Sequence, residues 1–163
     1  MAKSKEEKTN VMRVLEQKKI AYTAHTYPHE EGVAVDGVTV AQSMGFDPAA
    51  VFKTLVARGA SKQYYVFDVP VAENLDLKKA AKAVGEKSIE MLHQKELLPL
   101  TGYVHGGCSP VGMKKLFPTV IDASAENLET MIVSAGKIGY QVELSPRDLA
   151  ALVRAKFADL IAE

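Results

Sequence analysis

The stretch VFKTLVARGASKQYYVFDV, residues 51–69, carries the clearest structural signal in the chain. Two runs rich in Val, Phe and Tyr, residues 51–57 and 63–69, flank the polar segment RGASK, and this pattern is typical of a β-hairpin. Other apolar runs predict strands at residues 21–28, 88–92, 103–104, 119–122, 130–134 and 140–144. Strands therefore outnumber helices, and we expect an α+β fold with a mixed, largely antiparallel sheet that curls and has flanking helices.

Helices are predicted at residues 3–19, 38–44, 76–84, 93–98 and 145–161. Two of them have clear terminal signals. Asp76 is an expected N-cap and Gly85 an expected stop, because aspartate accepts from the first backbone amides and glycine adopts the left-handed conformation of a helix end. Ser145 followed by Pro146 opens the last helix in a similar way.

Length and composition indicate one globular domain spanning residues 1–163. Of the 163 residues, 47% are hydrophobic, and Lys plus Arg balance Asp plus Glu at 20 each. Without a net charge, the chain has no overall field that attracts DNA or RNA, so any contact with a polyanion must be local. The single cysteine excludes an internal disulfide, the charged start MAKSKEEKTN lacks the apolar core of a secretory signal, and no apolar stretch could cross a bilayer. We expect a cytoplasmic protein.

Lys53 is the most informative single residue. Strand alternation places it on the same face as Val51, Leu55 and Ala57. If this ammonium is buried it needs compensation, which a phosphate or carbonyl ligand would supply. Alternatively, Lys53 lies on an edge strand, where its stem covers apolar surface while its head reaches water. The alternation alone does not separate these two interpretations.

The segment GGCSPVG, residues 106–112, is a second candidate. Adjacent glycines let a backbone approach a ligand closely, so the amides of Gly106 and Gly107 are candidates for an oxyanion hole. A plain glycine-rich turn is the commoner explanation. Ser109 lacks the Gly-X-Ser-X-Gly setting of a hydrolase nucleophile.

Three further groups have weaker signals. His25, Tyr27 and His29 alternate within HTYPH and would line one face of a strand, but no third ligand makes a metal site of them. Cys108, three residues after His105, lacks an orienting acid, so we expect it to be a packing residue rather than a nucleophile. The lysines at positions 78, 79, 82, 114 and 115 are candidates to contact phosphates, but the first three lie on a predicted helix, where a solvated face is the simpler explanation.

The chain resembles the YbaK/EbsC family of aminoacyl-tRNA deacylases, which is related to the editing insertion of bacterial prolyl-tRNA synthetases. The likeness covers nearly the whole length and rests on HTYPHE, VFKTLV, NLDLKKAAKAVGEKSIEM, TGYVHGGCSPVGMKKLFPTVID and DLAALVRAKFADL. It implies a mixed sheet curled toward a barrel and hydrolysis of the ester that joins a wrong amino acid, chiefly cysteine on tRNA(Pro), to the 3′ end of tRNA. The implied partners are that tRNA end and prolyl-tRNA synthetase, with no membrane, no DNA, no metal and no cofactor. In this mechanism the substrate's own thiol attacks the ester carbonyl.

The resemblance also assigns roles to individual positions. Lys53 matches the family's essential lysine, and Gly106, with Gly107 beside it, matches the backbone that meets the reacting carbonyl. The expected substrate-binding residues are Tyr27, His29, Ser109, Ser134 and Gln141.

Two positions depart from the family pattern. Gln141 stands where similar proteins carry Asp, and Ala135 replaces a Gly. The first departure leaves the amino acid open, so that a deacylase for a different small amino acid such as Ala-tRNA(Pro) is an alternative. Two alternatives from other classes are a non-catalytic tRNA- or nucleotide-binding module and a structural adaptor.

Overall fold

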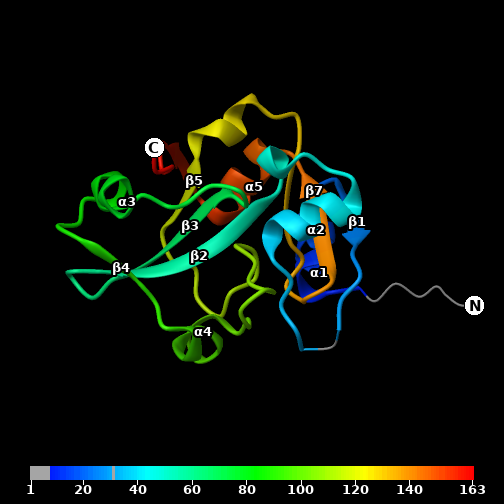
Figure 1. Cartoon of the computed structure of the whole chain (residues 1–163), viewed down its shortest axis with the longest axis horizontal. Coiled ribbons are helices and arrows are strands. Elements are labelled where there is room, and N and C mark those ends of the chain that lie inside the picture. Colours follow the sequence, from blue (N-terminus) through cyan, green and yellow to red (C-terminus); the bar gives the residue numbers. More distant parts are fainter. Residues whose placement is uncertain (1–7, 31) are drawn as a thin grey trace, which may run out of the picture.

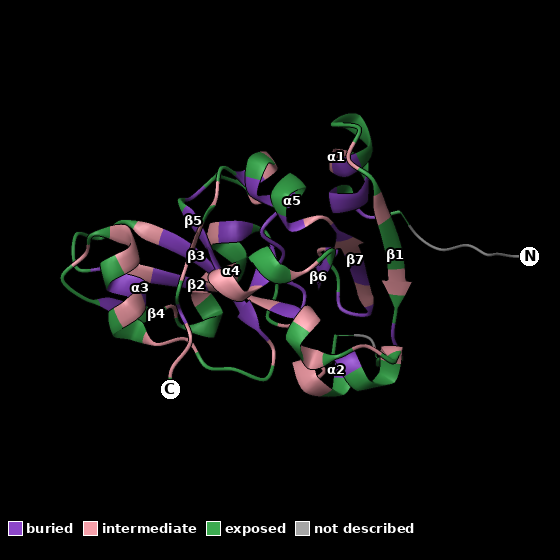
Figure 2. Cartoon of the chain, turned by 90° about the horizontal axis from the view of Figure 1, so that it is seen from above, coloured by how far each residue is buried: buried purple, intermediate pink, exposed green. Residues whose placement is uncertain are grey.

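The computed structural model describes residues 8–30 and 32–163 and contains two β-sheets (Figure 1). The smaller sheet has three strands in the order β1 (Tyr22–Thr26), β7 (Tyr140–Leu144) and β6 (Met131–Ser134), and both pairings are antiparallel. Helices α1 and α2 lie on opposite faces of this sheet, as the two perpendicular views show (Figures 1 and 2).

The larger sheet has five strands, built around the predicted hairpin. Its order is β4 (Ile89–Met91), β2 (Phe52–Gly59), β3 (Tyr64–Pro70), β5 (Thr119–Asp122) and β8 (Lys156–Ala158). The pairs β2–β3 and β2–β4 are antiparallel, whereas β3–β5 and β5–β8 are parallel. A parallel bridge between Val51 and Ile132 joins the two sheets, and neither sheet closes into a barrel. The predicted α+β class with a mixed, largely antiparallel arrangement is confirmed.

The helices begin and end largely where local signals place them. They are α1 (Asn10–Gln17), α2 (Gly37–Met44), α3 (Leu77–Val84), α4 (Gln94–Thr101) and α5 (Pro146–Val153), with short 3₁₀ turns at Pro48–Ala50 and Ala123–Asn127. Asp76 accepts hydrogen bonds from two amides of the first turn of α3, and Gly85 ends that helix in the left-handed conformation, as predicted. The same chemistry confirms Ser145 as the N-cap of α5.

Several predicted boundaries are wrong. The last helix was expected to continue to about residue 161 but ends at Val153, because Arg154 adopts a left-handed φ of 58° and the chain turns into β8. That strand is stabilised by pairing with β5, a contact distant in sequence. Residues 103–104 form no strand and instead lead into a turn. The first helix begins at Asn10, behind the N-cap Thr9, and the rest of its predicted start, residues 3–7, lies outside the described residues.

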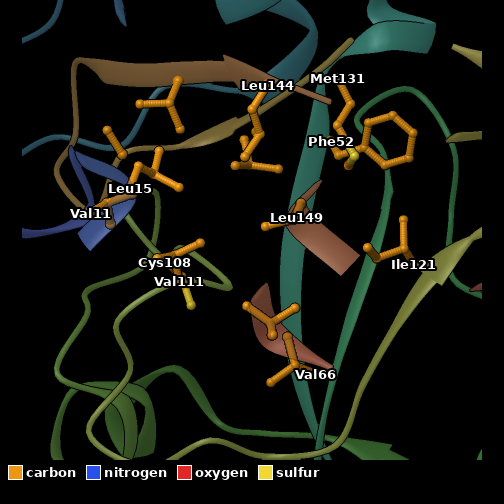
Figure 3. Packing of buried hydrophobic residues seen from close by; sticks show 14 of the residues in the cluster. Val11, Leu15, Phe52, Val66, Cys108, Val111, Ile121, Met131, Leu144 and Leu149 are labelled. Carbon is orange, nitrogen blue, oxygen red and sulfur yellow. The ribbon is translucent and has the colours of Figure 1, made fainter. Parts of the chain in front are cut away.

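The main core fills the space between the two sheets, α1 and α5 (Figure 3). Its buried side chains come from α1 (Val11, Leu15), both sheets (Phe52, Ile121, Met131) and α5 (Leu149). A second cluster lies between the larger sheet and α3, and a third holds α2 against Val51 and Ile132. Figure 2 shows the resulting pattern, in which the central strands are buried and the outer helix surfaces are exposed. Among the described helices, none is long and apolar enough to cross a membrane.

Candidate active site

One cavity of about 350 Å³ lies near the junction of the two sheets, among α2, the start of β2 and the loop after α4. Five of the expected catalytic and substrate-binding residues line it together, with the candidate pair of His105 and Cys108: Tyr27, Lys53, Gly106, Ser134 and Gln141. Small-molecule sites in proteins have volumes of about 300–1,000 Å³. The cavity therefore suits a small ligand or the end of a larger one.

Lys53 reaches this cavity from the start of β2, near the junction of the two sheets. In the described chain, β4 pairs with β2 only at residues 57–59, and on that side the start of β2 approaches β6 through the bridge between Val51 and Ile132. Along β2, Lys53 stands between Val51, which belongs to the cluster under α2, and Leu55, which packs on the cluster under α3. The apolar residues predicted on the face of Lys53 thus pack on two hydrophobic clusters, one on each side of it along the strand.

The electrostatic setting of Lys53 favours a ligand. Burial lowers the pKa of its ammonium, while Asp36 and Glu73 act in the opposite direction. Within residues 8–30 and 32–163, no group makes a hydrogen bond or close ion pair with this ammonium. A half-buried cation without a bonded partner is costly, and a ligand acceptor that enters the cavity would reduce this cost.

Gly106 presents its backbone through a tight turn. The Gly107 amide donates to the carbonyl of Val104 at 3.0 Å, and Gly106, at the third position of this turn, has a φ of +89°. A positive φ at that position alone is characteristic of a type II turn and suits glycine. The turn's hydrogen bond does not use the Gly106 amide, which has no protein acceptor in the described chain. This amide is the available donor of the glycine pair.

Gly107 and Ser109 have structural surroundings instead. The Gly107 amide is occupied in the turn, and a side chain there would meet the backbone nitrogen of Ile138 at 3.1 Å. Ser109 is fully buried, and its hydroxyl accepts a hydrogen bond from the Val111 amide at 3.2 Å. Neither residue lines the cavity.

Gln141 and Ser134 face each other on β7 and β6 at one wall of the cavity. Gln141 is only 7% exposed, and its side-chain oxygen Oε1 has no hydrogen-bond partner among the described residues. A buried acceptor left in this state costs about 1–3 kcal/mol. The Ser134 hydroxyl is used locally, accepting from the Gly136 amide at 3.0 Å. A ligand that donates to Gln141 Oε1 would satisfy the unpaired oxygen.

The residues of the HTYPH motif separate. Because β1 ends before Tyr27, the alternation expected over residues 25–29 does not persist. Tyr27 is buried and lines the cavity. His25 bonds Glu143 at 2.8 Å instead, and exposed His29 lies outside the cavity with Nδ1 3.2 Å from the carbonyl of Tyr27.

Cys108 belongs to the main core, where it packs beside Val111 (Figure 3), and it also lines the cavity. Burial raises the pKa of its thiol to about 12, and the carboxyl of Asp68 acts in the same direction. The thiol is therefore protonated at neutral pH, which agrees with the packing role predicted for it. His105 lines the cavity but makes no hydrogen bond to Cys108 in the described structure.

The basic clusters have local partners. Lys79 pairs with Asp159 at 3.0 Å, and Lys114 donates to the carbonyl of Pro99 at 3.3 Å. Lys115 lies over the ring of Phe117. These contacts fit the interpretation as a solvated surface. Within the described chain, no three or more His, Cys, Asp or Glu side chains come together in a metal-binding arrangement.

Sequence reasoning missed two residues: Thr54, which follows Lys53 on β2, and Asp68, its partner on β3. Thr54 lines the cavity, and its hydroxyl donates to Asp68 at 2.6 Å. Asp68 is fully buried on β3, directly opposite Thr54. The available signal was an acidic residue inside the apolar run YYVFDV, since an aspartate at a buried strand position needs a reason.

Comparison with known proteins gives consistent results. Residues 32–152 match the model of the aminoacyl-tRNA editing domain. A protein of Enterococcus faecalis named as a Cys-tRNA(Pro)/Cys-tRNA(Cys) deacylase, EbsC, is 45% identical over 161 residues, which is 98% of each chain. A crystal structure named as a trans-editing enzyme for prolyl tRNA synthetase is 26% identical, with a TM-score of 0.79 over 94% of this chain and 95% of the other.

Proposed function

The chain belongs to the aminoacyl-tRNA editing domain family, and we propose that it is a trans-editing hydrolase that removes cysteine from Cys-tRNA(Pro). One observation carries the assignment of the site. In the described chain, the Lys53 ammonium, the Gly106 amide and Gln141 Oε1 each lack a protein hydrogen-bond partner, and all three residues line one cavity. Two donors and one acceptor are thus available to a ligand.

These groups match the reacting end of an aminoacyl-tRNA. The ester carbonyl becomes an oxyanion when it is attacked, and the Gly106 amide is a preorganised donor for that charge. The Lys53 cation suits the terminal ribose and phosphate, which carry acceptor oxygens and negative charge. The Gln141 oxygen is a neutral acceptor for the α-ammonium of the amino acid. A carboxylate would hold that ammonium more strongly, so Gln141 supports binding with a weaker bond.

The cavity favours an attacker supplied by the substrate. Cys108 is held as a thiol by burial, and the Ser134 hydroxyl is engaged with Gly136 without a base beside it. In Cys-tRNA the substrate's own sulfur bonds to the carbonyl carbon, and the carbon–oxygen bond to the ribose then breaks. The thiol proton is passed to the departing ribose oxygen. The products are free tRNA and a cysteine thiolactone, which water opens to cysteine.

Prolyl-tRNA synthetase is the proposed partner. Cys-tRNA(Pro) is a product of mischarging by that enzyme, and the balanced charge of this chain gives it no general attraction for tRNA. Delivery by the synthetase would supply tRNA specificity that the small cavity does not. We place this reaction in the cytoplasm, where tRNA is charged.

A panel of charged tRNAs tests the proposal. Cys-tRNA(Pro), Ala-tRNA(Pro), Cys-tRNA(Cys) and correctly charged Pro-tRNA(Pro) are incubated with the protein, with and without prolyl-tRNA synthetase, and the remaining ester is measured over time. We expect the fastest loss for Cys-tRNA(Pro) and none for Pro-tRNA(Pro). Faster loss of Ala-tRNA(Pro) would reassign the amino acid, and binding without any turnover would make the protein a tRNA-binding module.

A further inference from the structure

Asp68 lies beneath the candidate active site and has no structural task that explains it. It is fully buried in the centre of the larger sheet, between β2 and β5. Its Oδ1 accepts one hydrogen bond, from the Thr54 hydroxyl at 2.6 Å, and its Oδ2 has no partner in the described structure. A buried carboxyl with one bond is costly, and an amide or apolar residue would fit the sheet at lower free energy.

Asp122, a buried aspartate on the neighbouring strand β5, has a clear structural role by comparison. Asp122 ends β5, and both of its oxygens accept backbone amides, from Leu160 at 2.9 Å and Ser124 at 3.0 Å. These bonds hold the chain directly after β5 and the segment that follows β8. Among residues 8–30 and 32–163, no backbone amide donates to Asp68, and the one hydrogen bond that it accepts comes from Thr54 in the cavity wall.

A threonine hydroxyl has one hydrogen to donate and two lone pairs with which to accept. When Asp68 is a carboxylate, it can only accept, so the hydrogen of Thr54 must point toward it. The lone pairs of Thr54 are then the part of the hydroxyl left for the cavity. A protonated Asp68 can donate to Thr54 instead and release that hydrogen.

We propose that Asp68 is a positioning residue that makes the Thr54 hydroxyl a hydrogen-bond acceptor for a donor group at the aminoacyl end of the substrate. This inference rests on the proposed deacylase function and adds Thr54 to the site of Lys53, Gly106 and Gln141. The donors that such a substrate offers are its α-ammonium, its ribose hydroxyl and, for cysteine, its thiol.

An acceptor role fits the pair better than a nucleophilic one. A carboxylate is a far weaker base than an alkoxide, so Asp68 can orient the hydrogen of Thr54 without removing it. Burial raises the pKa of Asp68 to about 7, which the Thr54 bond partly offsets. The ionisable group that the structure places near Asp68 is the Cys108 thiol, on the loop after α4, and burial keeps that thiol neutral. We therefore expect the orientation of the Thr54 hydroxyl to follow the protonation of Asp68.

The test compares four forms of the full chain: wild type, Thr54→Val, Asp68→Asn and the double variant. Single-turnover deacylation of Cys-tRNA(Pro) is measured from about pH 5.5 to about pH 8.5, a range that brackets the raised pKa, with the uncatalysed rate subtracted at each pH. Thr119→Val is the matched control, because Thr119 is a buried threonine on β5 whose hydroxyl donates to a backbone carbonyl, that of Phe117, at 2.9 Å.

We expect the wild-type rate to rise through a neutral inflection that Asp68→Asn lacks and Thr119→Val retains. Thr54→Val should be slower by about 10-fold, the loss expected for one hydrogen bond to the substrate. The double variant should be no slower than Thr54→Val, because Asp68 acts through Thr54. The carboxyl carbon of Asp68, followed by NMR, should titrate at higher pH in Thr54→Val, since the bond that lowers its pKa is gone.

Three results would overturn the inference: an unchanged neutral inflection in Asp68→Asn, losses that multiply in the double variant, or an acyl group found on Thr54 by mass spectrometry. The Asp68→Asn arm stands even if Thr54→Val does not fold. Failure of the proposed function looks different, because then the wild-type protein itself would leave Cys-tRNA(Pro) intact at every pH.

Discussion

Lys53 on β2 and Gly106 in the loop after α4 line the same cavity, although they belong to separate elements of the chain. The first residue contributes a cation with its pKa lowered by burial, and the second contributes a backbone amide outside the turn's hydrogen bond. Their meeting explains how a site can act on an activated ester without a protein nucleophile. Position and charge stabilisation are the main requirements for such a reaction.

The conformation of Gly106 leads to the first prediction. In Gly106→Ala, the new Cβ would lie 2.7 Å from Cβ of Ala34 at a φ of +89°, so the turn must shift and move the amide. We expect deacylation to fall by about 100-fold, as for the loss of an oxyanion donor. Gly102→Ala is the control, because Gly102 is exposed, has a φ of +88° and would meet only the flexible side chain of Lys114, at 3.4 Å. Equal rates for the two variants would remove Gly106 from the mechanism.

Cys108→Ala should remain active. Cys108 lines the cavity as well as packing in the main core, but burial raises the pKa of its thiol to about 12, so the thiol is not ionised at neutral pH. We expect a modest loss of stability, about 1 kcal/mol for the removed buried atom, and a rate within a factor of about two of wild type. Alkylation by iodoacetamide should be slow in the native protein and fast in urea. A folded but inactive Cys108→Ala protein would restore the nucleophile hypothesis.

Replacing Gln141 separates binding from stability. Gln141→Met keeps the volume but removes Oε1, an atom that has no partner in the described chain. No protein group loses a hydrogen bond, so the free energy of unfolding should stay equal or rise. The value of kcat/KM for Cys-tRNA(Pro) should fall by about 10-fold or more, since the substrate loses an acceptor. Thermal melting and steady-state kinetics on the same preparations measure both; unchanged kinetics would show that no substrate group binds Gln141.

The buried carboxyl of Asp68 should make stability depend on pH. Burial raises its pKa from 3.8 to about 7, so the folded chain holds this proton more tightly than the unfolded chain does. The contribution of Asp68 is therefore most favourable below about pH 4 and is lost progressively as the pH rises through the folded pKa near 7. Asp68→Asn removes the penalty and should be more stable than wild type at about pH 8, by an amount on the order of 4 kcal/mol. Urea unfolding of both proteins at low and high pH measures the difference, and a difference independent of pH would contradict it.

Local signals in the sequence predicted local structure well. Asp76 and Gly85 mark the ends of α3 because a side-chain cap and a left-handed glycine act within one helical turn. The end of α5 was missed because it depends on a distant contact: β8 pairs with β5, which stands far earlier in the chain. Helical periodicity over residues 145–161 gave no indication of that partner.

In the candidate site too, local sequence signals were predictive, whereas features that depend on the folded backbone were not. Lys53 was recognisable because a charged residue interrupts an apolar strand face, and the loop of Gly106 was recognisable by its glycines. The positions of Gly107, Ser109 and His29 outside the cavity could not be predicted from residue types. The Gly107 amide closes a turn, the Ser109 hydroxyl accepts from the Val111 amide, and β1 ends before the chain reaches His29.

The most direct test of the account is single-turnover deacylation of Cys-tRNA(Pro) by wild type and Lys53→Met, which keeps the apolar stem and removes the cation. We expect the variant to be at least about 100-fold slower and to have the same circular dichroism spectrum as wild type. Its melting temperature should be equal or higher, because the ammonium has no bonded partner to lose within the described chain. A folded Lys53→Met protein that deacylates at the wild-type rate would contradict the assignment of this cavity as the active site.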